Sequence, residues 1–364
     1  MSGAFTFEVI DQGSAISVHG ELSLALDRQG NPSVAYALAS GAIMLARRSG
    51  GAWTREELPS GSTAVLDDTR IRLAIDSRGS PHVAFRHQTG VLVYAVKRDN
   101  QWSNPIQVST ALSGGPRPAG IAAFDMGVHP GRLTPELRDI PQLVYADLTT
   151  GDLGYTQIGG TSHAPMSIAQ IGKDEEKAAT QTGLHASMTF DPGSEEMHIA
   201  YVSHVEQESV TLVTLRRKRI IGTQPLALSP ATDIEKSEAI NVLSTSIVRT
   251  GFSTCIAYFD LASRSVKAFF ESADLPGCGR IEPVDSNIGA TVEVSAAANR
   301  GQFRITYADA NAIKLASRDR VGAWAVESVE AVSGKLPSLA YDNAGTANLA
   351  YATGGALKFA RRVE

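Results

Sequence analysis

The chain has 364 residues, of which 43% are hydrophobic and 20% charged, and its formal net charge is −5 at pH 7. The acidic balance argues against nucleic acid as a partner, because nucleic-acid binding needs a basic surface that displaces counterions. The chain also lacks an apolar run of the roughly 20 residues that cross a bilayer, so we expect no membrane partner.

The start of the chain and its cysteines indicate a compartment. Residues 1–8 contain no basic segment followed by an apolar core, so the sequence shows no signal peptide and we expect a cytoplasmic protein. A secreted protein would require that such a leader had been removed. Cys255 and Cys278 can form one disulfide bond at most, which leaves their redox state open.

The first residues of the chain show a unit of four short strands. Apolar segments at 22–27, 33–38, 42–47 and 53–58 are separated by turns rich in Gly, Asn and Ser. Glycine and asparagine supply the positive φ angles that tight hairpins require. The same unit returns at 73–76, 81–85, 91–97 and 102–108. We therefore predict two consecutive four-stranded antiparallel sheets.

One strand recurs along the whole chain. It ends in an aliphatic residue, a small, polar or aliphatic residue and then an aromatic, and successive aromatics lie 44 to 60 residues apart. The seven aromatics are Tyr36, Phe85, Tyr145, Tyr201, Tyr258, Tyr307 and Tyr351. A period of about 40 to 60 residues with several short strands per copy is typical of a β-propeller. The sequence therefore predicts an all-β fold of seven four-stranded blades.

The later blades and the closure follow from the same pattern. We expect them at 117–171, 183–229, 237–286, 290–332 and 337–364, and the third carries an insertion at 126–140. The last segment contains only three strands, and residues 6–11 form an unpaired strand that can supply the fourth. Pairing the two termini removes exposed sheet edges. We thus predict a single β-propeller domain over 1–364.

Two further recurrent features have structural interpretations. Trp53, Trp102 and Trp324 each open the fourth strand of a blade, which indicates packing between blades. The turn after the first strand repeats an aspartate followed by a glycine, at Asp27, Asp76, Asp191 and Asp342. This turn resembles the Asp-box of BNR-repeat, sialidase-like propellers, where the aspartate caps the hairpin through its own backbone. We interpret these aspartates as structural.

Candidate functional residues lie where the repeat stops repeating. In a propeller, the loops that enter the first strand and those that leave the second meet at one mouth of the central channel, where ligand sites are favoured. These positions carry imidazoles, carboxylates and arginines, and they predict one asymmetric site. The predicted catalytic residues are His87, His185 and Arg70. The predicted substrate-binding residues are Arg86, Asp147, His204, Asp260, Asp309 and His19.

A resemblance suggests the chemistry. The segment 79–87, with sequence Gly-Ser-Pro-His-Val-Ala-Phe-Arg-His, resembles the repeat of BNR-type propeller polysaccharide lyases. The resemblance implies that Arg70 or Arg86 neutralises a uronate carboxylate and that His87 or His185 exchanges the proton. We therefore expect a lyase or hydrolase that acts on a carbohydrate or another polar anionic substrate, with a glycan or small-molecule ligand and no cofactor.

Three alternatives stay open. The first is a non-catalytic propeller that binds a glycan or a protein, with residues 134–137 as a short capped helix and 173–177 as a charged linker among its contacts. The second is an iron centre of the kind held by axial histidines in some seven-bladed oxygenases, which would use His19, His87, His185 and His204. The third is a metal site built from His82, His198 and Cys255.

Overall fold

The protein is described by a computed structural model. It describes residues 4–13, 21–59, 70–87, 90–108, 121–147, 151–159, 164–170, 179–207, 210–223, 226–228, 232–237, 240–251, 253–272, 279–289, 293–319 and 321–363. His19, Cys278 and the segment 173–177 lie outside these residues. The predictions made for them therefore stay predictions.

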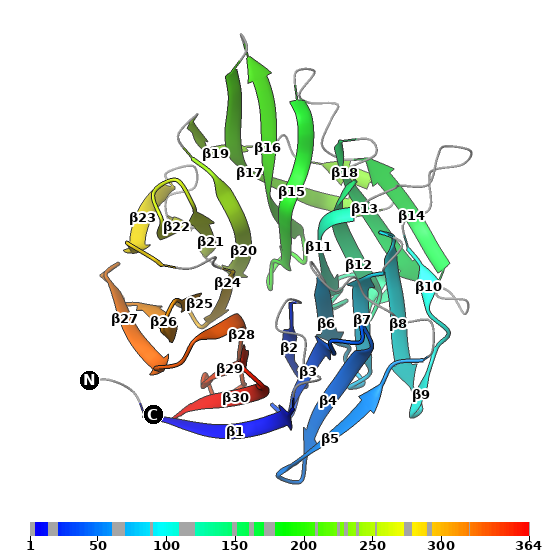
Figure 1. Cartoon of the computed structure of the whole chain (residues 1–364). Coiled ribbons are helices and arrows are strands. Elements are labelled where there is room, and N and C mark those ends of the chain that lie inside the picture. The colour runs from blue at the N-terminus through cyan, green and yellow to red at the C-terminus, as the bar shows by residue number, and fades with distance from the viewer. Residues whose placement is uncertain are drawn as a thin grey trace. The chain divides into compact units, whose positions relative to one another are not determined.

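The strands divide between two compact units (Figure 1). The first unit comprises Met1–Ile106 and Asn287–Glu364, and the second comprises Gln107–Ser286. The four sheets of the first unit are β1 (Ala4–Gln12) with β28 (Gly334–Tyr341), β29 (Ala347–Thr353) and β30 (Ala356–Val363); β2 (Ser23–Leu26) with β3 (Pro32–Ala37), β4 (Ile43–Ser49) and β5 (Ala52–Glu57); β6 (Ile71–Ile75) with β7 (Pro81–Arg86), β8 (Leu92–Arg98), β9 (Gln101–Trp102) and β10 (Ile106–Gln107); and β24 (Val294–Asn299) with β25 (Gln302–Asp309), β26 (Ala312–Arg318) and β27 (Trp324–Glu330).

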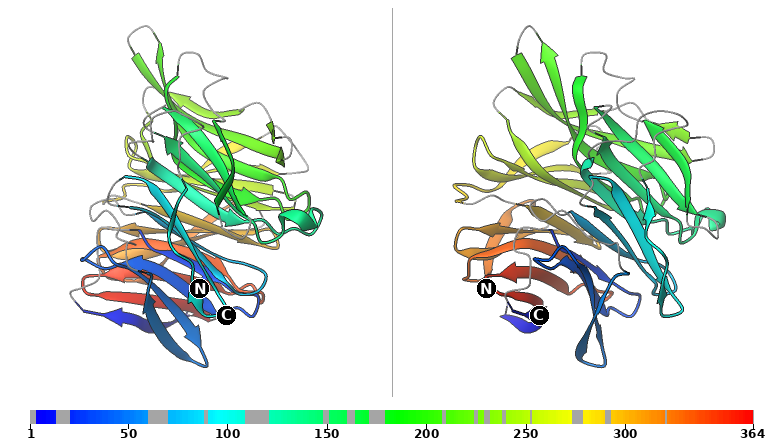
Figure 2. Two further views of the ribbon diagram at one scale, coloured as in Figure 1. Left: turned by 90° about the vertical axis from the view of Figure 1, so that its right-hand side faces the viewer. Right: turned by 45° about the vertical axis from the view of Figure 1, so that its right-hand side comes forward.

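The second unit has the same construction (Figure 2). Its sheets are β11 (Ile121–Val128) with β12 (Pro141–Asp147), β13 (Asp152–Gly159) and β14 (Ala164–Gln170); β15 (Ala179–Phe190) with β16 (Met197–Gln207), β17 (Val210–Thr223), β18 (Leu226–Leu228) and β19 (Thr232–Ser237); and β20 (Val242–Thr250) with β21 (Ser253–Asp260), β22 (Ser265–Ser272) and β23 (Arg280–Asp285). In two sheets the fourth position is filled by two short strands, β9 with β10 and β18 with β19.

These seven antiparallel sheets make the fold a seven-bladed β-propeller, as the repeat predicted. The predicted closure is confirmed as well. β1 pairs with β30 from Ala4 opposite Val363 to Gln12 opposite Ala356, so the N-terminal strand completes the C-terminal blade. The one helical element among the described residues is a 3-10 turn, η1 (Pro135–Leu137).

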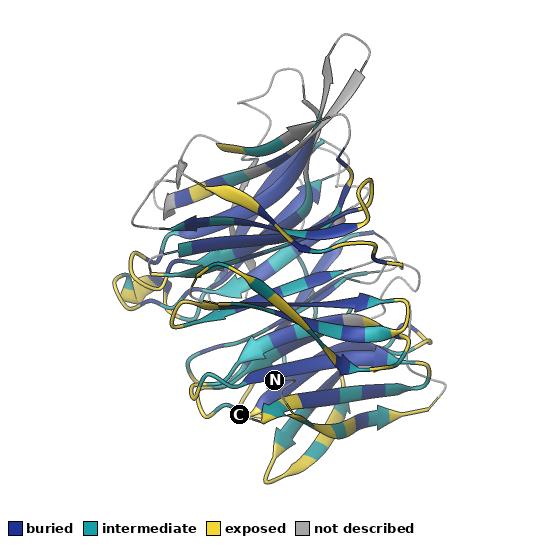
Figure 3. Ribbon diagram, turned by 90° about the vertical axis from the view of Figure 1, so that its left-hand side faces the viewer, coloured by how far each residue is buried: buried dark blue, intermediate teal, exposed yellow. Residues whose placement is uncertain are grey.

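The recurrent strand is the buried centre of each sheet. All residues of β3 are buried, as are nearly all of β7, β12 and β29, and the seven recurrent aromatics are at most 4% exposed. Figure 3 shows buried residues along the inner strands, and exposed residues at the turns and on outer strands such as β5 and β27. A strand covered on both faces needs apolar side chains at every position, which explains why alternation fades there.

Buried tyrosine hydroxyls of this register pair with carboxylates from the preceding sheet. Tyr36 donates to Asp11 at 2.6 Å, and Tyr351 donates to Glu330 at 2.5 Å. In the second unit the hydroxyl of Tyr258 donates to a carboxylate of β19 in the same way. Burial is the largest cause that raises the pKa of each of these tyrosines, and the neighbouring carboxylate adds to it.

The first strands of neighbouring sheets are joined by a second recurrent contact. The hydroxyl of Ser23 accepts a hydrogen bond from the backbone N–H of Leu73 at 3.0 Å, and Ser187 accepts one from Ile247 at 3.1 Å. Ser338 and Ser295 make the same contact in the first unit. These positions explain why a small hydroxyl recurs on an otherwise apolar strand.

The recurrent turn aspartates cap their own hairpins, as predicted. Asp27 accepts hydrogen bonds from the backbone N–H groups of Gln29 and Asn31, both at 2.9 Å. Asp76, Asp191 and Asp342 make equivalent contacts. Trp53 packs edge-on against Phe359 with ring centroids 5.5 Å apart, which agrees with its interpretation as a packing residue.

The insertion of the third blade is anchored by one glutamate. β11 continues to Val128, so the extra residues begin later than the sequence pattern indicated, and η1 lies within them. Thr134 precedes η1 but makes no side-chain cap; its hydroxyl donates to Glu195 at 3.0 Å. Glu195 also accepts hydrogen bonds from the backbone N–H groups of Leu133 and Thr134.

Candidate functional site

The predicted site residues fall into two sets, one in each compact unit. The first unit contains Arg70, Arg86, His87 and Asp309. The second unit contains Asp147, His185, His204 and Asp260. The convergence of both sets on one site stays a prediction.

Glu21 and two arginines form the polar centre of the first set. Glu21 precedes β2, and its carboxylate lies 3.7 Å from Nε of Arg70, just before β6 in the neighbouring sheet. Arg72 forms a second ion pair with the same carboxylate. The side chains of Glu21 and Arg70 are only 12% and 13% exposed, so this charge cluster is partly withdrawn from water. One carboxylate therefore contacts two guanidinium groups from the neighbouring sheet.

Arg86 and His87 lie beside Arg70 at the end of the same hairpin. The backbone N–H of Arg86 donates to the carbonyl of Arg70 at 3.2 Å. His87 begins a tight turn in which its N–H donates to Val91 at 2.8 Å and its carbonyl accepts from Gly90 at 2.8 Å. Both side chains are half-buried. The two sequence positions predicted to meet, before the first strand and after the second, are thus adjacent in this blade.

Asp309 connects three segments of its own blade through hydrogen bonds and an ion pair. Its Oδ1 accepts hydrogen bonds from the N–H groups of Gly289 at 3.0 Å and Ala310 at 2.7 Å, and Oδ2 pairs with Nζ of Lys314 at 2.8 Å. Burial opposes the charged form, but Lys314 and the backbone donors outweigh it and lower the pKa of Asp309. The carboxylate therefore stays ionised and ties the entry of the blade to its second turn.

Asp260 repeats this arrangement in the second unit. It is 1% exposed, accepts from the N–H of Asn241 at 3.0 Å and pairs with Lys267 at 3.0 Å. Burial again opposes ionisation, whereas Asn241, Ser263 and Lys267 lower the pKa. A lysine opposite the recurrent tyrosine was the sequence signal for this brace, since Lys267 lies opposite Tyr258 and Lys314 opposite Tyr307. Neither lysine was among the predicted site residues.

His185 lies at an irregularity of β15. Its φ is +52°, and the pairing of β15 with β16 shifts register between Leu184 and Ser187. The hydroxyl of Thr245 donates to the carbonyl of His185. Such bulges redirect a side chain out of the strand pattern and are frequent near functional sites. This backbone feature sets His185 apart from the corresponding positions of regular strands.

His204 and Asp147 each follow a buried recurrent strand. His204 is half-buried, and burial lowers the pKa of its imidazole. Its neighbour Ser203 is fully buried, and its hydroxyl has no hydrogen-bond partner among the described residues. Asp147 pairs in register with Asp152, and both carboxylates raise the pKa of Tyr145 in addition to the larger effect of burial.

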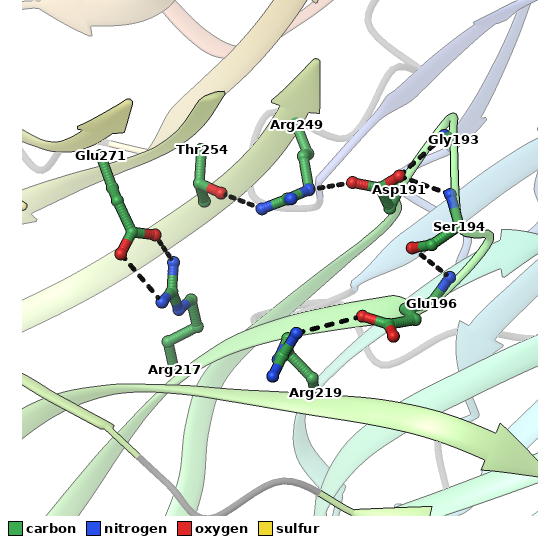
Figure 4. A network of polar contacts seen from close by, with 9 residues as sticks. All are labelled: Asp191, Gly193, Ser194, Glu196, Arg217, Arg219, Arg249, Thr254 and Glu271. Atoms are coloured by element: carbon green, nitrogen blue, oxygen red, sulfur yellow. Dashed lines mark hydrogen bonds and ion pairs between the residues drawn. The ribbon is translucent and has the colours of Figure 1, made fainter. Parts of the chain in front are cut away.

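A separate polar network occupies the second unit (Figure 4). Arg249 joins Asp191 to Thr254, and Arg217 makes two contacts with Glu271. His198 lies near these arginines; it is 2% exposed, and neither ring nitrogen has a partner among the described residues. Burial, followed by the charges of Arg249 and Arg217, lowers the pKa of His198 to about 3. A neutral imidazole is therefore part of the packing here.

The structure describes no group of three or more His, Cys, Asp or Glu side chains placed to hold a metal ion. No helix in the described part of the chain is long and apolar enough to cross a membrane.

Solved structures of other proteins share this fold. No family model and no curated protein matches the chain. A polysaccharide lyase described as an ulvan lyase matches with a TM-score of 0.62 at 11% identity, over 98% of this chain and 94% of its own. An inactive variant of virginiamycin B lyase from Staphylococcus aureus matches with a TM-score of 0.55 at 12% identity, over 99% and 100%. The SapL1 lectin in complex with α-methyl fucoside matches with a TM-score of 0.53 at 12% identity, over 86% and 97%. At such identities the likeness shows the seven-bladed propeller alone.

Proposed function

We propose that the protein is an enzyme that acts on a carbohydrate or another polar anionic substrate by lyase-type acid–base chemistry. The observation that supports this proposal is the adjacency of Arg70, Arg86 and His87 at the end of one hairpin. Two arginines and a histidine at neighbouring backbone positions are suited to a substrate that carries a carboxylate next to an acidic C–H bond. The lyases among the similar folds make this chemistry plausible for the scaffold.

The reaction would proceed as an elimination. An arginine binds the substrate carboxylate and stabilises the negative charge that develops when the neighbouring C–H bond breaks. His87 takes that proton, and the electron pair of the C–H bond becomes the new C=C bond. The glycosidic C–O bond on the next carbon breaks, and the leaving oxygen receives a proton from solvent. His185, in the second unit, is the alternative base.

The test is a screen of anionic polysaccharides and small uronates for the ultraviolet absorbance of an unsaturated product. We expect His87→Ala to abolish turnover, and Arg86→Met to raise KM more than it lowers kcat. Arg78→Met is the matched control, because Arg78 is exposed in a turn of the same sheet. Loss of turnover in His185→Ala with normal turnover in His87→Ala would move the base to the second unit.

The second candidate function is a binding module without turnover. It is favoured by Asp260 and Asp309, whose carboxylates are already engaged by a lysine and by backbone donors. It agrees with the fold shared with a lectin. Binding of a glycan without product, unchanged in His87→Ala, would support this module and refute the enzyme.

A further inference from the structure

A polar cavity lies in the first unit at the turn-bearing end of the sheet β2–β5. Its volume is about 380 Å³, within the roughly 300–1,000 Å³ that small-molecule sites span. Its lining comes from strands β4 and β5, from the turn that holds Asp27 and Asn31, and from Lys97 and Asn100 of the neighbouring sheet.

Four cations line this cavity, and one of them is available to a ligand. The carboxylate partners of the other three are Glu56 for Lys97, Asp11 for Arg55 and Glu8 for Arg48. Arg47 makes no ion pair within the described residues. Among these residues, its side chain makes one hydrogen bond, to the carbonyl of Gly79 at 3.2 Å. A guanidinium carries five N–H donors, so most donors of Arg47 remain for a partner.

The carboxylates of the cavity are already committed. Both oxygens of Glu56 contact Nζ of Lys97, at 2.6 and 2.7 Å. Asp27 accepts two backbone N–H groups and the side-chain amide of Asn31, each at 2.9 Å. Arg47 is therefore the cation of this lining that pairs with no carboxylate among the described residues. An oxyanion is the group that it recognises best, because guanidinium pairs with carboxylate or phosphate in bidentate geometry.

The remaining polar wall suits hydroxyl groups. Asn31 uses its amide N–H toward Asp27, so its carbonyl oxygen is an available acceptor. Asn100 is exposed at the rim with a φ of +64°, and its amide makes no hydrogen bond with the described residues. Amide groups that both donate and accept match hydroxyls, which do the same.

We propose that this cavity binds a hydroxylated oxyanion of sugar size, with its anionic group on Arg47 and its hydroxyls on Asn31 and Asn100. A sugar acid and a sugar phosphate share this chemistry. The site uses none of the residues of the proposed lyase chemistry, so it holds or fails independently of that proposal.

The experiment is calorimetric titration of the full chain with glucuronate, glucose 6-phosphate and glucose. We expect at least one anionic sugar to bind, and glucose to bind about tenfold more weakly or not at all, since one charge-assisted contact is worth about 1.4 kcal/mol or more. Which anion binds identifies the source of the oxyanion. Failure of both anionic sugars, or equal binding of glucose, would overturn the proposal.

Two variants locate the site. Arg47→Met keeps most of the aliphatic stem and removes the guanidinium, and we expect it to lose binding. Arg78→Met makes the same change of charge in an exposed turn and should bind normally. If Arg47→Met does not fold, Asn100→Asp at the rim is the substitute, since it adds a repelling charge where the backbone tolerates Asp. If Arg47→Met folds and still binds the anion normally, the proposed site is refuted. The same holds for normal anion binding by Asn100→Asp where that variant replaces Arg47→Met.

Discussion

Replacing Asp76 by Ala tests whether one repeated turn also anchors a buried network. Asp76 accepts the N–H groups of Arg78 and Ser80, both at 2.8 Å, and lies 3.4 Å from Nε2 of His82. Nδ1 of His82 is 2.6 Å from the hydroxyl of Tyr94, and His82 is fully buried. Without the carboxylate, Nε2 of His82 has no hydrogen-bond partner in the described part of the chain.

The internal repeat supplies a matched control. Asp27 caps the equivalent turn with the same two backbone contacts, but Ser33 stands where the next blade has His82. Loss of contacts that water can replace should cost about 1 kcal/mol in Asp27→Ala. Leaving the buried imidazole of His82 without a hydrogen-bond partner adds about 1–3 kcal/mol. We therefore expect Asp76→Ala to lower the free energy of unfolding by about 2–4 kcal/mol in total.

Urea unfolding followed by tryptophan fluorescence measures this difference. Trp53, Trp102 and Trp324 all lie in the first unit with Asp76, so the signal reports that unit even if the two units unfold separately. If Asp76→Ala is no more destabilising than Asp27→Ala, then the buried His82 does not depend on the Asp76 carboxylate.

The same network predicts a pH dependence. Burial opposes the charge, but His82 and the two backbone donors lower the pKa of Asp76 from 3.8 to about 2. Because the pKa is lower in the folded state than in the unfolded state, the ionised carboxylate stabilises the folded protein above pH 3.8. This stabilisation is lost as the pH falls toward 2. The difference corresponds to about 2 kcal/mol. Asp76→Asn should show a smaller loss of stability over this range than the unmodified chain.

Three further predictions concern the packing. Ser23→Ala leaves the buried N–H of Leu73 without its acceptor, and urea unfolding followed by fluorescence should show a loss of about 1–3 kcal/mol. Gly154→Ala places a methyl group against the ring of Tyr145, and circular dichroism during urea unfolding should show a loss of about 1–3 kcal/mol; an unchanged midpoint would mean that the ring moves aside at no cost. His198 should remain neutral at pH 5 in an NMR titration, and its contribution to stability should fall as pH drops from 6.5 toward 3, because only the unfolded state takes up the proton there. An NMR signal that titrates near 6.5 would contradict the burial of this imidazole.

The fold was accessible from the sequence because a propeller repeats its local chemistry. Each blade repeats an apolar strand that ends in an aromatic, and four blades also repeat an aspartate that caps a turn, so the copies reinforce one pattern. Even the closure followed from counting, since the last blade lacked a strand that the N-terminus could supply. The start of the insertion was placed too early, because β11 continues to Val128 through residues that do not repeat.

The candidate site depended on contacts that no repeat encodes. The sequence placed Arg70 and Arg86 in equivalent mouth positions, but only tertiary structure paired Glu21 with Arg70 and Arg72. Asp309 was predicted to bind substrate, and in the structure Lys314 and two backbone N–H groups hold its carboxylate. Whether a charge is engaged depends on side chains from separate strands, and their distances are set only by folding.

The sequence by itself thus determined the seven blades, their strand order and the pairing of the N-terminal strand with the last blade, since these follow from local periodicity. Tertiary structure decided which polar side chains are engaged and which are available. Arg47 shows the difference, because it is one of four cations around a cavity and only the three ion pairs of its neighbours distinguish it.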